Sequence, residues 1–580
     1  MLQWQSAIHC NWHDNKSIIQ YCKERDMYLE RVEIYGFRGI NRLSLQLNNN
    51  TVLIGENSWG KSSLLDALDI ILSPENREYQ ITASDFHHPT GDNEALNRSL
   101  QIVLKFCESA PGRHQSYRFQ NLASVWVDNG DGLKHIFYRV SAELKDDNTV
   151  TVDKCFLNSG GNKLSLDNVG KYIKEIVRLY PVIRLRDARF INDLNPITVT
   201  GGSSNFRDTL NQQIKELTRA LVNNPERLSN EDLKDGIDAM QQLLSHYFSG
   251  KSGHMTKLGH SYSSIEPRKR GWQALDNINR LIAKPNQRNI RLIILGVFSS
   301  LLQAKGNIEL DKHARPIIIV EDPETRLHPI MLSIAWGLFS LFSLQRITTT
   351  NSGDLLSQAP IDSVCRLVRD TNKVSTFRIA PNDLSPEELR KISFHIRFNR
   401  PSALFARCWL LVEGETEIWL MSEFARQCNY FFETEGIKVI AFAQSGLKPL
   451  LKYANKMGIE WHVLTDGDEA GRKYAATATH YANKINSPDR DRLTMLSAPD
   501  MEHFLYREGF KSLYHEIAEI PENARVSTRR VILKAISRTS KPDLALATVN
   551  RAAELGPDSV PLALRNMFSR VAWLARGKAY

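Results

Sequence analysis

Apolar and polar residues alternate in short runs near the start of the chain, a pattern that predicts β-strands. The alternation runs from Tyr28 to Tyr35, and a second strand is expected at about 43–47. The apolar run Val52–Ile54 predicts a third strand, which leads into a glycine-rich loop. Apolar residues then recur at helical spacing from Leu64 to Leu72, and the helix is expected to stop at Ser73-Pro74.

Alternation returns over 101–157, which predicts an antiparallel sheet with turns at 129–132 and 158–161. The stretch 204–248 has a helical, strongly charged pattern, and 250–270 is rich in Gly, Ser, His and Lys, which indicates a loop. A fresh alternation of strands and helices begins with the apolar run Cys408–Val412. The chain of 580 residues is too long for a single core, so two or more domains are expected.

Composition narrows the class of protein. With 42% hydrophobic and 24% charged residues, the chain is expected to be soluble and globular. The apolar stretch Ile330–Leu344 is too short for a confident membrane span, and Met1–Met27 lacks the pattern of a signal peptide. The seven cysteines form no C-x-x-C pair, which argues against a disulfide framework or a zinc site and favours a cytoplasmic protein.

Charge is mildly basic, with a formal net charge of +9. This value permits nucleic acid as a partner without establishing it. Eleven of the residues from Arg525 to the end are Lys or Arg, and they outnumber the acidic residues there. A basic helical tail of this kind is either a solvated surface or a surface that follows the phosphates of DNA. Arg184, Arg186 and Arg189 leave the same two alternatives open.

The loop after Val52–Ile54 reads Gly-Glu-Asn-Ser-Trp-Gly-Lys-Ser-Ser and fits the phosphate-binding pattern G-x-x-x-x-G-K-S. Backbone N–H groups and the helix N-terminus are expected to wrap the phosphates of ATP, while the Lys reaches the terminal phosphates and the first Ser ligates Mg²⁺. A chance glycine turn is the alternative, and the flanking strand and helix argue against it. The predicted nucleotide-binding residues are Gly55, Glu56, Asn57, Gly60, Lys61, Ser62 and Ser63.

A buried strand is expected at Pro316–Val320, and two adjacent carboxylates follow it. Glu321 would hold Mg²⁺ directly or through water, and Asp322 would orient or deprotonate the attacking water. A solvated acidic turn at a strand end is the alternative for this segment taken alone. The phosphate-binding loop earlier in the chain favours the nucleotide-site interpretation.

Acidic residues also follow the strands predicted in the C-terminal part. Glu413 ends the run Cys408–Val412, and Asp466 and Asp468 end a run that starts at Trp461. Acids at the carboxyl edge of a parallel sheet lie where α/β folds build sites, and their mutual repulsion calls for divalent metal. Surface carboxylates are the alternative for each acid. The predicted metal ligands are Glu413, Glu417, Asp466, Asp468, Asp500 and Glu502.

The first set of motifs resembles the ABC-type ATPases of the SMC and RecF kind. Their entry pattern is matched by Phe37-Arg38-Gly39, which adds Arg38 to the nucleotide site, and the Leu-His-Pro after their acidic strand is matched by 327–329. The Ser-x-Gly-x-Gln signature is represented only by 269–273, and Asn351 stands where a histidine usually senses the terminal phosphate. The resemblance therefore implies an ATP-binding homodimer with slow hydrolysis.

The second set, Glu…Asp-x-Asp, resembles the Toprim domains, and downstream of an ABC-type ATPase it resembles the OLD (overcoming lysogenisation defect) nucleases. The resemblance implies a two-metal hydrolysis of DNA with Mg²⁺ or Mn²⁺, plus one further ion bound with ATP. It places Glu413, Asp466 and Asp468 on one metal, and Glu417 and Glu502 on the other with help from Asp500. Lys541 would lie against the scissile phosphate.

The expected fold class is α/β: an ABC-type ATPase domain with a helical dimerisation insertion, followed by a Rossmann-like Toprim domain. The expected boundaries are an N-terminal extension at 1–26, the ATPase at 27–203 and 265–400, the insertion at 204–264, and the Toprim domain with its basic tail at 401–580. An accessory protein is possible but is not implied by any motif.

Competing functions remain open at this stage. The protein could be a DNA-binding clamp or repair-loading factor with an inert Toprim domain, although the full set of acids with Lys541 argues against inertness. A topoisomerase would need a nucleophilic tyrosine domain, and a primase would need zinc-binding and polymerising modules, for which the sequence offers no segment. The DNA that is cut, the effect of ATP on cutting, and the role in phage defence or repair do not follow from the sequence.

Overall fold

The structure is a computed structural model, and it describes residues 27–73, 79–88, 98–185, 310–325 apart from 312, and 344–577 apart from 371, with a few isolated positions between 233 and 339. The N-terminal extension, the insertion at 204–264 apart from positions 233 and 236, the signature at 269–273 and the Leu-His-Pro at 327–329 lie outside the described residues. The chain divides into two compact units. The first takes residues 1–53 and 57–351, and the second takes 54–56 and 352–580.

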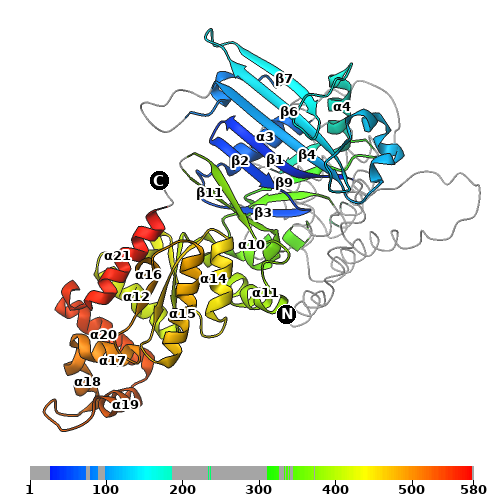
Figure 1. The fold of residues 1–580 in the computed structure, drawn as a ribbon. Helices are drawn as coiled ribbons and strands as arrows, with labels where there is room; N and C mark the ends of the chain where they lie inside the picture. The colour runs from blue at the N-terminus through cyan, green and yellow to red at the C-terminus, as the bar shows by residue number, and fades with distance from the viewer. Residues whose placement is uncertain are drawn as a thin grey trace, which may run out of the picture. The chain divides into compact units, whose positions relative to one another are not determined.

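The antiparallel part of the first unit is a sheet in which β1 lies between β2 and β4, and β6 lies between β4 and β7. Alternate side chains of β1, β2 and β6 are buried, as the sequence pattern predicts, whereas β7 has a run of exposed residues followed by three buried ones. In Figure 1, β6 and β7 form a long hairpin. The strands are β1 (Met27–Phe37), β2 (Ile40–Gln46), β4 (Ser99–Glu108), β5 (Val127–Asp128), β6 (Lys134–Leu144) and β7 (Val150–Leu157).

The parallel part of the first unit positions the nucleotide motifs. Strand β10 (Arg346–Thr349) pairs with β3 (Asn50–Ile54) on one side and with β9 (Ile317–Glu321) on the other, and β8 (Val182–Leu185) pairs with β9. Helix α3 (Lys61–Leu72) follows β3, and its leucines are buried. The phosphate-binding loop therefore joins a buried strand to a helix, as predicted. Helix α4 (Val169–Leu179) precedes β8.

One part of this unit differs from the sequence prediction. The interval between β4 and β5, expected as sheet, contains the 3₁₀ segments Arg113–Gln115 and Tyr117–Val125. Phe119, Leu122 and Val125 are buried there, so the apolar side chains of this stretch pack into the core from helical turns and not from a strand. The predicted turn at 129–132 does join β5 to β6, and Gly161 N donates to Asn158 O in the second predicted turn.

The second unit contains the antiparallel pair β11 (Val364–Arg369) and β12 (Val374–Arg378) and a four-stranded sheet of order β14-β13-β15-β16. All pairs of that sheet are parallel. Its strands are β13 (Cys408–Val412), β14 (Ile437–Ala441), β15 (Glu460–Thr465) and β16 (Leu493–Met495). The long helices of this sheet follow its strands: α12 (Glu415–Gln427), α14 (Leu447–Lys456) and α15 (Glu469–Lys484).

The remaining helices complete this unit, and α17 to α20 gather at one end of it in Figure 1. They are α10 (Gly353–Gln358), α11 (Pro386–Ile392), the π-helical Ser393–Phe398, α13 (Phe432–Glu435), α16 (Asp489–Arg492), α17 (Met501–Leu505), α18 (Lys511–Ala518), α19 (Thr528–Arg538), α20 (Lys541–Leu555) and α21 (Leu562–Arg576). No helix among the described residues is both long and apolar enough to cross a bilayer.

The basic C-terminal helices are part of the folded core and do not form an appended tail. Val531 and Ile532 of α19, Leu544 of α20 and Leu564 of α21 are almost completely buried in one hydrophobic cluster with the helix α12. The two strand tryptophans Trp409 and Trp461 are fully buried, whereas Trp419 is 38% exposed and does not belong to the core.

Candidate functional site

The phosphate-binding loop ends at a helix N-terminus that no side chain caps. Gly60 is the N-cap residue of α3 with a φ of 88°, and a glycine has no side chain that could cap the helix. Gly55 also has a positive φ, of 150°. These positive φ angles favour glycine. Because no side chain caps the 12-residue helix, its first N–H groups can bind an anion. Ser62 is exposed, and Ser63 Oγ accepts from Gly39 N at 3.3 Å.

The lysine of this loop is buried and points to an amide. Lys61 Nζ donates to Asn351 Oδ1 at 2.9 Å, and Asn351 Nδ2 donates to Asn57 Oδ1 at 3.3 Å. Glu324 accepts from Asn351 N at 2.6 Å and from Thr350 Oγ1 at 3.0 Å. Residues predicted from two separate motifs, the phosphate-binding loop and the Asn351 position, are thus brought together at the terminal cation of Lys61.

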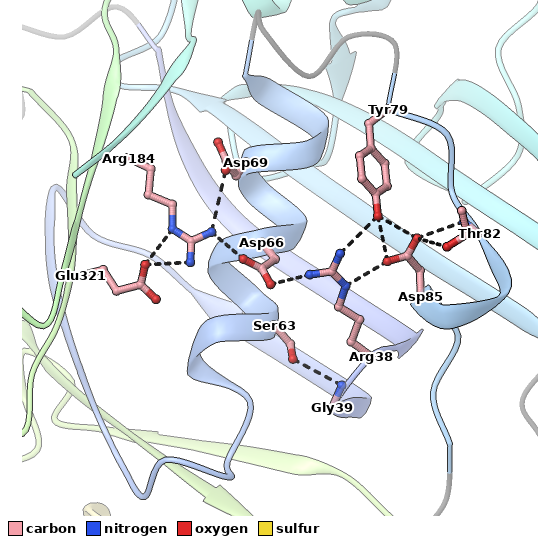
Figure 2. A network of polar contacts seen from close by, with 10 residues as sticks. All are labelled: Arg38, Gly39, Ser63, Asp66, Asp69, Tyr79, Thr82, Asp85, Arg184 and Glu321. Atoms are coloured by element: carbon pink, nitrogen blue, oxygen red, sulfur yellow. Dashed lines mark hydrogen bonds and ion pairs between the residues drawn. The ribbon is translucent and has the colours of Figure 1, made fainter. Parts of the chain in front are cut away.

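The acidic strand end is held by an arginine that sequence reasoning did not place there. Arg184 on β8 donates to Glu321 Oε2 at 2.8 and 2.9 Å and to Asp66 Oδ1 on α3 at 2.5 Å. Arg184 is 5% exposed, so it is neither a surface residue nor available to DNA as it stands. Figure 2 shows this guanidinium between the end of β9 and helix α3. Arg186 and Arg189 lie outside the described residues.

Arg38 is held by the same network from the other side of α3 (Figure 2). Its nitrogens donate to Asp66 Oδ2 at 2.5 Å, to Asp85 Oδ1 at 2.9 Å and to Tyr79 Oη at 3.2 Å. All three guanidinium nitrogens therefore have protein partners, and contact of Arg38 with a nucleotide would require exchange of one of them. Asp66 bridges Arg38 and Arg184, a link that no local sequence pattern signals.

Asp322 adopts a conformation that β-carbon-bearing residues rarely take, with a φ of 39°. Its Oδ1 accepts from Thr349 Oγ1 at 2.8 Å, and its N–H donates to the Thr349 carbonyl at 3.2 Å. Thr349 ends the neighbouring strand β10. The Asp322 N–H also donates to Thr349 Oγ1 at 3.1 Å, so the strained residue at the end of the acidic strand is fixed by three contacts to one threonine. Such outliers gather at functional sites.

Glu56 takes a partner within the second unit. Its carboxylate receives two hydrogen bonds from the guanidinium of Arg407, at 2.5 and 2.8 Å, and Arg407 directly precedes β13. The two-bond geometry is the strong form of an Arg–carboxylate pair. Glu56 is therefore held by the residue that precedes β13 in the same unit.

Three of the predicted metal ligands lie at the carboxyl ends of two neighbouring parallel strands. Glu413 follows β13, and Asp466 and Asp468 follow β15, which pairs with β13 from Cys408↔Glu460 to Leu411↔Val463. Asp468 caps helix α15 by accepting from Gly471 N at 2.6 Å. The segment after β16 passes close by, because Gly467 N donates to Ala498 O at 2.9 Å. A side chain at Gly467 would meet that carbonyl at 2.6 Å.

The electrostatics of these acids show that their charges act on one another. Burial first, and the charges of Glu413, Glu417, Asp500 and Asp468 after it, together raise the pKa of Asp466 to about 8. Burial also raises the pKa of Glu413, and Asp468 and Glu417 add to the effect. Glu413 Oε2 is buried without a hydrogen-bond partner. Mutually repelling carboxylates with one unpartnered oxygen among them fit a site for divalent cations.

A second group surrounds a cavity of about 160 Å³ between α12, α17 and α20. Lys541 Nζ lies 2.9 Å from Glu502 Oε1, and Glu417 lines the same cavity. Burial raises the pKa of Glu417, and the charge of Glu502 raises it further while Lys541 lowers it. Asp500 caps α17 by accepting from His503 N at 2.7 Å, and it directly precedes the helix that carries Glu502.

The six acids are looser in this structure than a loaded site would be. Among the described residues, the one set of three acid, thiol or imidazole groups whose ligand atoms all lie within 4.8 Å of one another belongs to the first unit and consists of Glu30, Cys107 and His135. Repulsion between uncompensated carboxylates is a sufficient physical reason for wider spacing in the second unit.

Two family models match the chain. Residues 27–403 match the family described as a protein of unknown function, DUF2813. Residues 404–468 match the Toprim domain of proteins like the overcoming lysogenization defect protein. The second match covers the strands that carry Glu413, Asp466 and Asp468.

Relatives extend over most of the chain. It is 53% identical over 553 residues to the uncharacterized protein YbjD of Escherichia coli K12, covering 95% of this chain and 100% of that protein. It is 22% identical over 476 residues to the endonuclease GajA of Bacillus cereus VD045, covering 77% and 76%. It is 28% identical over 194 residues to the Old nuclease of Escherichia phage P2, covering 31% and 32%.

Solved structures show weaker likeness. The C-terminal region of the Burkholderia pseudomallei OLD protein matches 30% of this chain and 99% of its own length, at 20% identity and a TM-score of 0.25. The recombination mediator RecF with ATP matches 60% and 99%, at 12% identity and a TM-score of 0.28. With scores this low, the assignment rests on the sequence matches. These confirm the resemblance to OLD nucleases: the chain belongs to the DUF2813 family, and its residues 404–468 carry an OLD-like Toprim domain.

Proposed function

We propose that this protein is an ATP-binding, divalent-metal-dependent DNA endonuclease or nickase whose phosphodiester hydrolysis takes place in the Toprim domain. The observation that carries the proposal is the convergence of Glu413, Asp466 and Asp468 at the ends of adjacent parallel strands, with the pKa of Asp466 raised to about 8. A carboxyl group held in this state is stabilised by a bound cation. The endonuclease and nuclease names of GajA and Old support the same chemistry.

The chain offers two groups of ligands. Glu413, Asp466 and Asp468 would hold one ion, and Glu417 and Glu502 would hold the second with help from Asp500. Bound Mg²⁺ or Mn²⁺ would supply an activated water and charge neutralisation at the leaving 3′ oxygen. The orphaned Glu413 Oε2 is the atom of this set that most needs a cation.

Lys541 would act on the phosphate itself. Burial lowers its pKa, but the hydrogen bond and charge of Glu502 outweigh burial, so the pKa stands above the ordinary value. The ammonium therefore stays charged at neutral pH. Lys541 lies at the N-terminus of the 15-residue helix α20, and the positive end of the helix dipole there also favours a bound anion such as the phosphate of DNA. A cation at this place stabilises the negative charge that develops during hydrolysis.

The first unit would bind ATP with one Mg²⁺. Gly55, Asn57, Gly60, Lys61, Ser62 and Ser63 would wrap the phosphates, Glu321 would reach the ion, and Asp322 would act on the attacking water. Glu56 and Arg38 take part through their protein contacts with Arg407 and with Asp66. We propose that the protein is a cytoplasmic homodimer. We also propose that its ATP hydrolysis is slow, because Asn351 stands where a histidine usually senses the terminal phosphate.

DNA would be contacted by a small set of unpaired cations. Most basic residues of the C-terminal helices are tied to acids, as Arg551 is to Glu516 and Arg570 is to Asp491. Arg525, Arg529, Arg530 and Lys534 make no ion pair with any described residue and lie at or just before α19. They form the surface that we call the α19 cation group.

The test is cleavage of supercoiled plasmid in Mg²⁺ or Mn²⁺, with and without ATP. Wild type should convert plasmid to nicked or linear product, and Asp466→Asn should lose at least about 100-fold of this activity while retaining ATP binding and thermal stability. Lys61→Ala should lose ATP binding and keep the metal-dependent chemistry measurable. Wild-type DNA binding with no cleavage in either metal would instead support a clamp or loading factor with an inert Toprim domain.

A further inference from the structure

A trio of unlike ligands lies on three neighbouring strands of the first unit, apart from the nucleotide motifs. Glu30 is on β1, Cys107 on β4 and His135 on β6. Cys107 is the register partner of both Tyr28 on β1 and His135 on β6. One ligand atom of each of the three residues lies within 4.8 Å of the other two.

A β-bulge brings the carboxylate to this trio. The register of β1 against β4 passes from Leu29↔Phe106 to Arg31↔Lys105, so Glu30 is an extra residue without a partner on β4. A bulge turns the side chain of its extra residue away from the regular alternation of the strand. The bulge therefore places Glu30 beside the cross-strand pair of Cys107 and His135.

The imidazole is prepared as a ligand. His135 is completely buried, and its Nε2 contacts the two carboxylate oxygens of Asp131 at 2.8 and 3.0 Å. Asp131 lies in the tight turn between β5 and β6, where its Oδ1 also accepts from Leu133 N at 3.1 Å. The other ring nitrogen, Nδ1, is buried without a hydrogen-bond partner, 3.6 Å from Glu30 Oε2. A carboxylate behind a histidine is the usual support of a metal-bound imidazole.

We propose that Glu30, Cys107 and His135 form a site for one Zn²⁺ ion, distinct from the Toprim acids. A thiolate, an imidazole nitrogen and a carboxylate oxygen are the three ligand types that zinc takes in proteins. Mg²⁺ prefers oxygen ligands in octahedral geometry, so this set discriminates against the ion of the nuclease reaction. Three protein ligands leave one position of a tetrahedron for water.

Lysine occupies part of the site in the metal-free protein. Lys105 Nζ lies 2.8 Å from Glu30 Oε2 and 5.7 Å from the centre of the Phe137 ring. Binding of the divalent ion would displace this ammonium and release the proton of Cys107, so that the two anionic ligands balance the ion. Burial first, and the charge of Glu30 second, raise the pKa of the Cys107 thiol to about 12, so the proton is present before the metal binds.

The test uses full-length protein stripped of metal with a chelator and titrated with Co²⁺ as a spectroscopic probe. One equivalent should produce a thiolate-to-cobalt charge-transfer band in the near ultraviolet, with d–d bands of tetrahedral intensity, and Zn²⁺ should bleach both. The carboxylate sites of the second unit contain no sulfur and cannot give this band. Its absence in the wild type would overturn the proposal.

Variants separate ligands from bystanders. Cys107→Ser and His135→Gln should abolish the band, whereas Cys155→Ser, at another buried thiol in the same sheet, should keep it. Asp131→Asn should weaken Co²⁺ binding about 10- to 100-fold. Lys105→Gln should strengthen it, because the competing cation is gone. A band that survives Cys107→Ser, or binding unchanged by Lys105→Gln, contradicts the site, and circular dichroism confirms that each variant is folded.

Discussion

Lys61 Nζ donates a 2.9 Å hydrogen bond to Oδ1 of Asn351, which follows the strand β10 beside the phosphate-binding loop. The partner is neutral and its bond must be exchanged when phosphate arrives. A hydrogen bond from a charged donor to a neutral acceptor contributes about 1.5–3 kcal/mol net, and an anionic acceptor such as a phosphate oxygen adds the attraction between opposite charges. The exchange therefore favours nucleotide, and Asn351 lowers the affinity that Lys61 would otherwise provide.

Removal of that amide should tighten nucleotide binding. We expect Asn351→Ala to bind a non-hydrolysable ATP analogue about 3- to 10-fold more tightly, and Lys61→Ala to bind it at least about 10-fold more weakly. Calorimetric titration measures both. Weaker binding by Asn351→Ala would show that the amide holds the nucleotide directly and does not compete for the lysine.

Turnover of ATP should be slow. With Asn351 in place of a histidine, the wild type is expected to hydrolyse ATP below about 1 per second, near the lower limit of ordinary enzymes. Phosphate release under saturating ATP, with and without DNA, gives the rate. Asn351→His offers the matched gain-of-function variant, and a wild-type rate well above that bound would contradict the expectation.

Asp66 should be a stability residue. It bridges Arg38 and the 5% exposed Arg184, so Asp66→Asn leaves a buried guanidinium short of its counter-charge. We expect a loss of about 3 kcal/mol in the free energy of unfolding. The control is Asp146→Asn, which removes the exposed pair with Arg98 and should cost below about 1 kcal/mol. Urea unfolding followed by tryptophan fluorescence measures the loss of unfolding free energy in both variants. Equal losses would show that the contacts of Asp66 with Arg38 and Arg184 do not stabilise the fold.

Asp466 should make the metal-free protein less stable as pH rises. Its pKa is about 8 in the folded protein and about 4 when unfolded. Between these values the folded state holds one more proton, so the stabilisation is complete below about pH 4 and is lost as pH rises through about 8. Melting temperatures of chelator-treated protein from pH 5 to 8.5 should fall more steeply for wild type than for Asp466→Asn.

The same comparison has an internal check. Burial lowers the pKa of His462 to about 4, which gives a slope of opposite sign below about pH 6.5 in both proteins. The difference between the two proteins therefore isolates Asp466. Saturating Mg²⁺ should remove the difference, and identical slopes without metal would mean that Asp466 ionises normally.

The α19 cation group should set the salt dependence of DNA binding. Arg525, Arg529, Arg530 and Lys534 changed together to Gln should reduce the slope of log affinity against log salt by about 0.9 for each DNA phosphate that is no longer neutralised. The matched control changes Arg551, Arg565, Arg570 and Arg576, which already have acidic partners, and should leave the slope nearly unchanged. Equal effects of the two sets would locate the DNA surface elsewhere.

Sequence patterns predicted the local features well. The strand Met27–Phe37, the loop before α3, and the strands ending at Glu413 and Asp466 all follow from alternation or from apolar runs bounded by glycine and acids. Such features depend on neighbours along the chain. The same patterns failed over 113–125, where apolar spacing fits a helical turn as well as a strand.

Relationships across the fold could not be predicted in this way. Arg184 meets Asp66 across 118 positions of the chain and Glu321 across 137, and nothing near Arg184 in the sequence announces either partner. Glu30 reaches Cys107 and His135 through a register shift of one residue, which only strand pairing reveals. The C-terminal basic residues suggest an appended tail in the sequence, but the apolar residues between them are buried in the core of the second unit.

In the proposed mechanism, the strand-end carboxylates capture divalent metal for DNA hydrolysis. Crystals of the full-length protein soaked in Mn²⁺, recorded at a wavelength where manganese scatters anomalously, test it most directly. We expect an anomalous peak bonded to Glu413, Asp466 and Asp468, with the three carboxylates drawn together, and its loss in Asp466→Asn. Carboxylates that stay apart with no peak between them at saturating Mn²⁺ would contradict it.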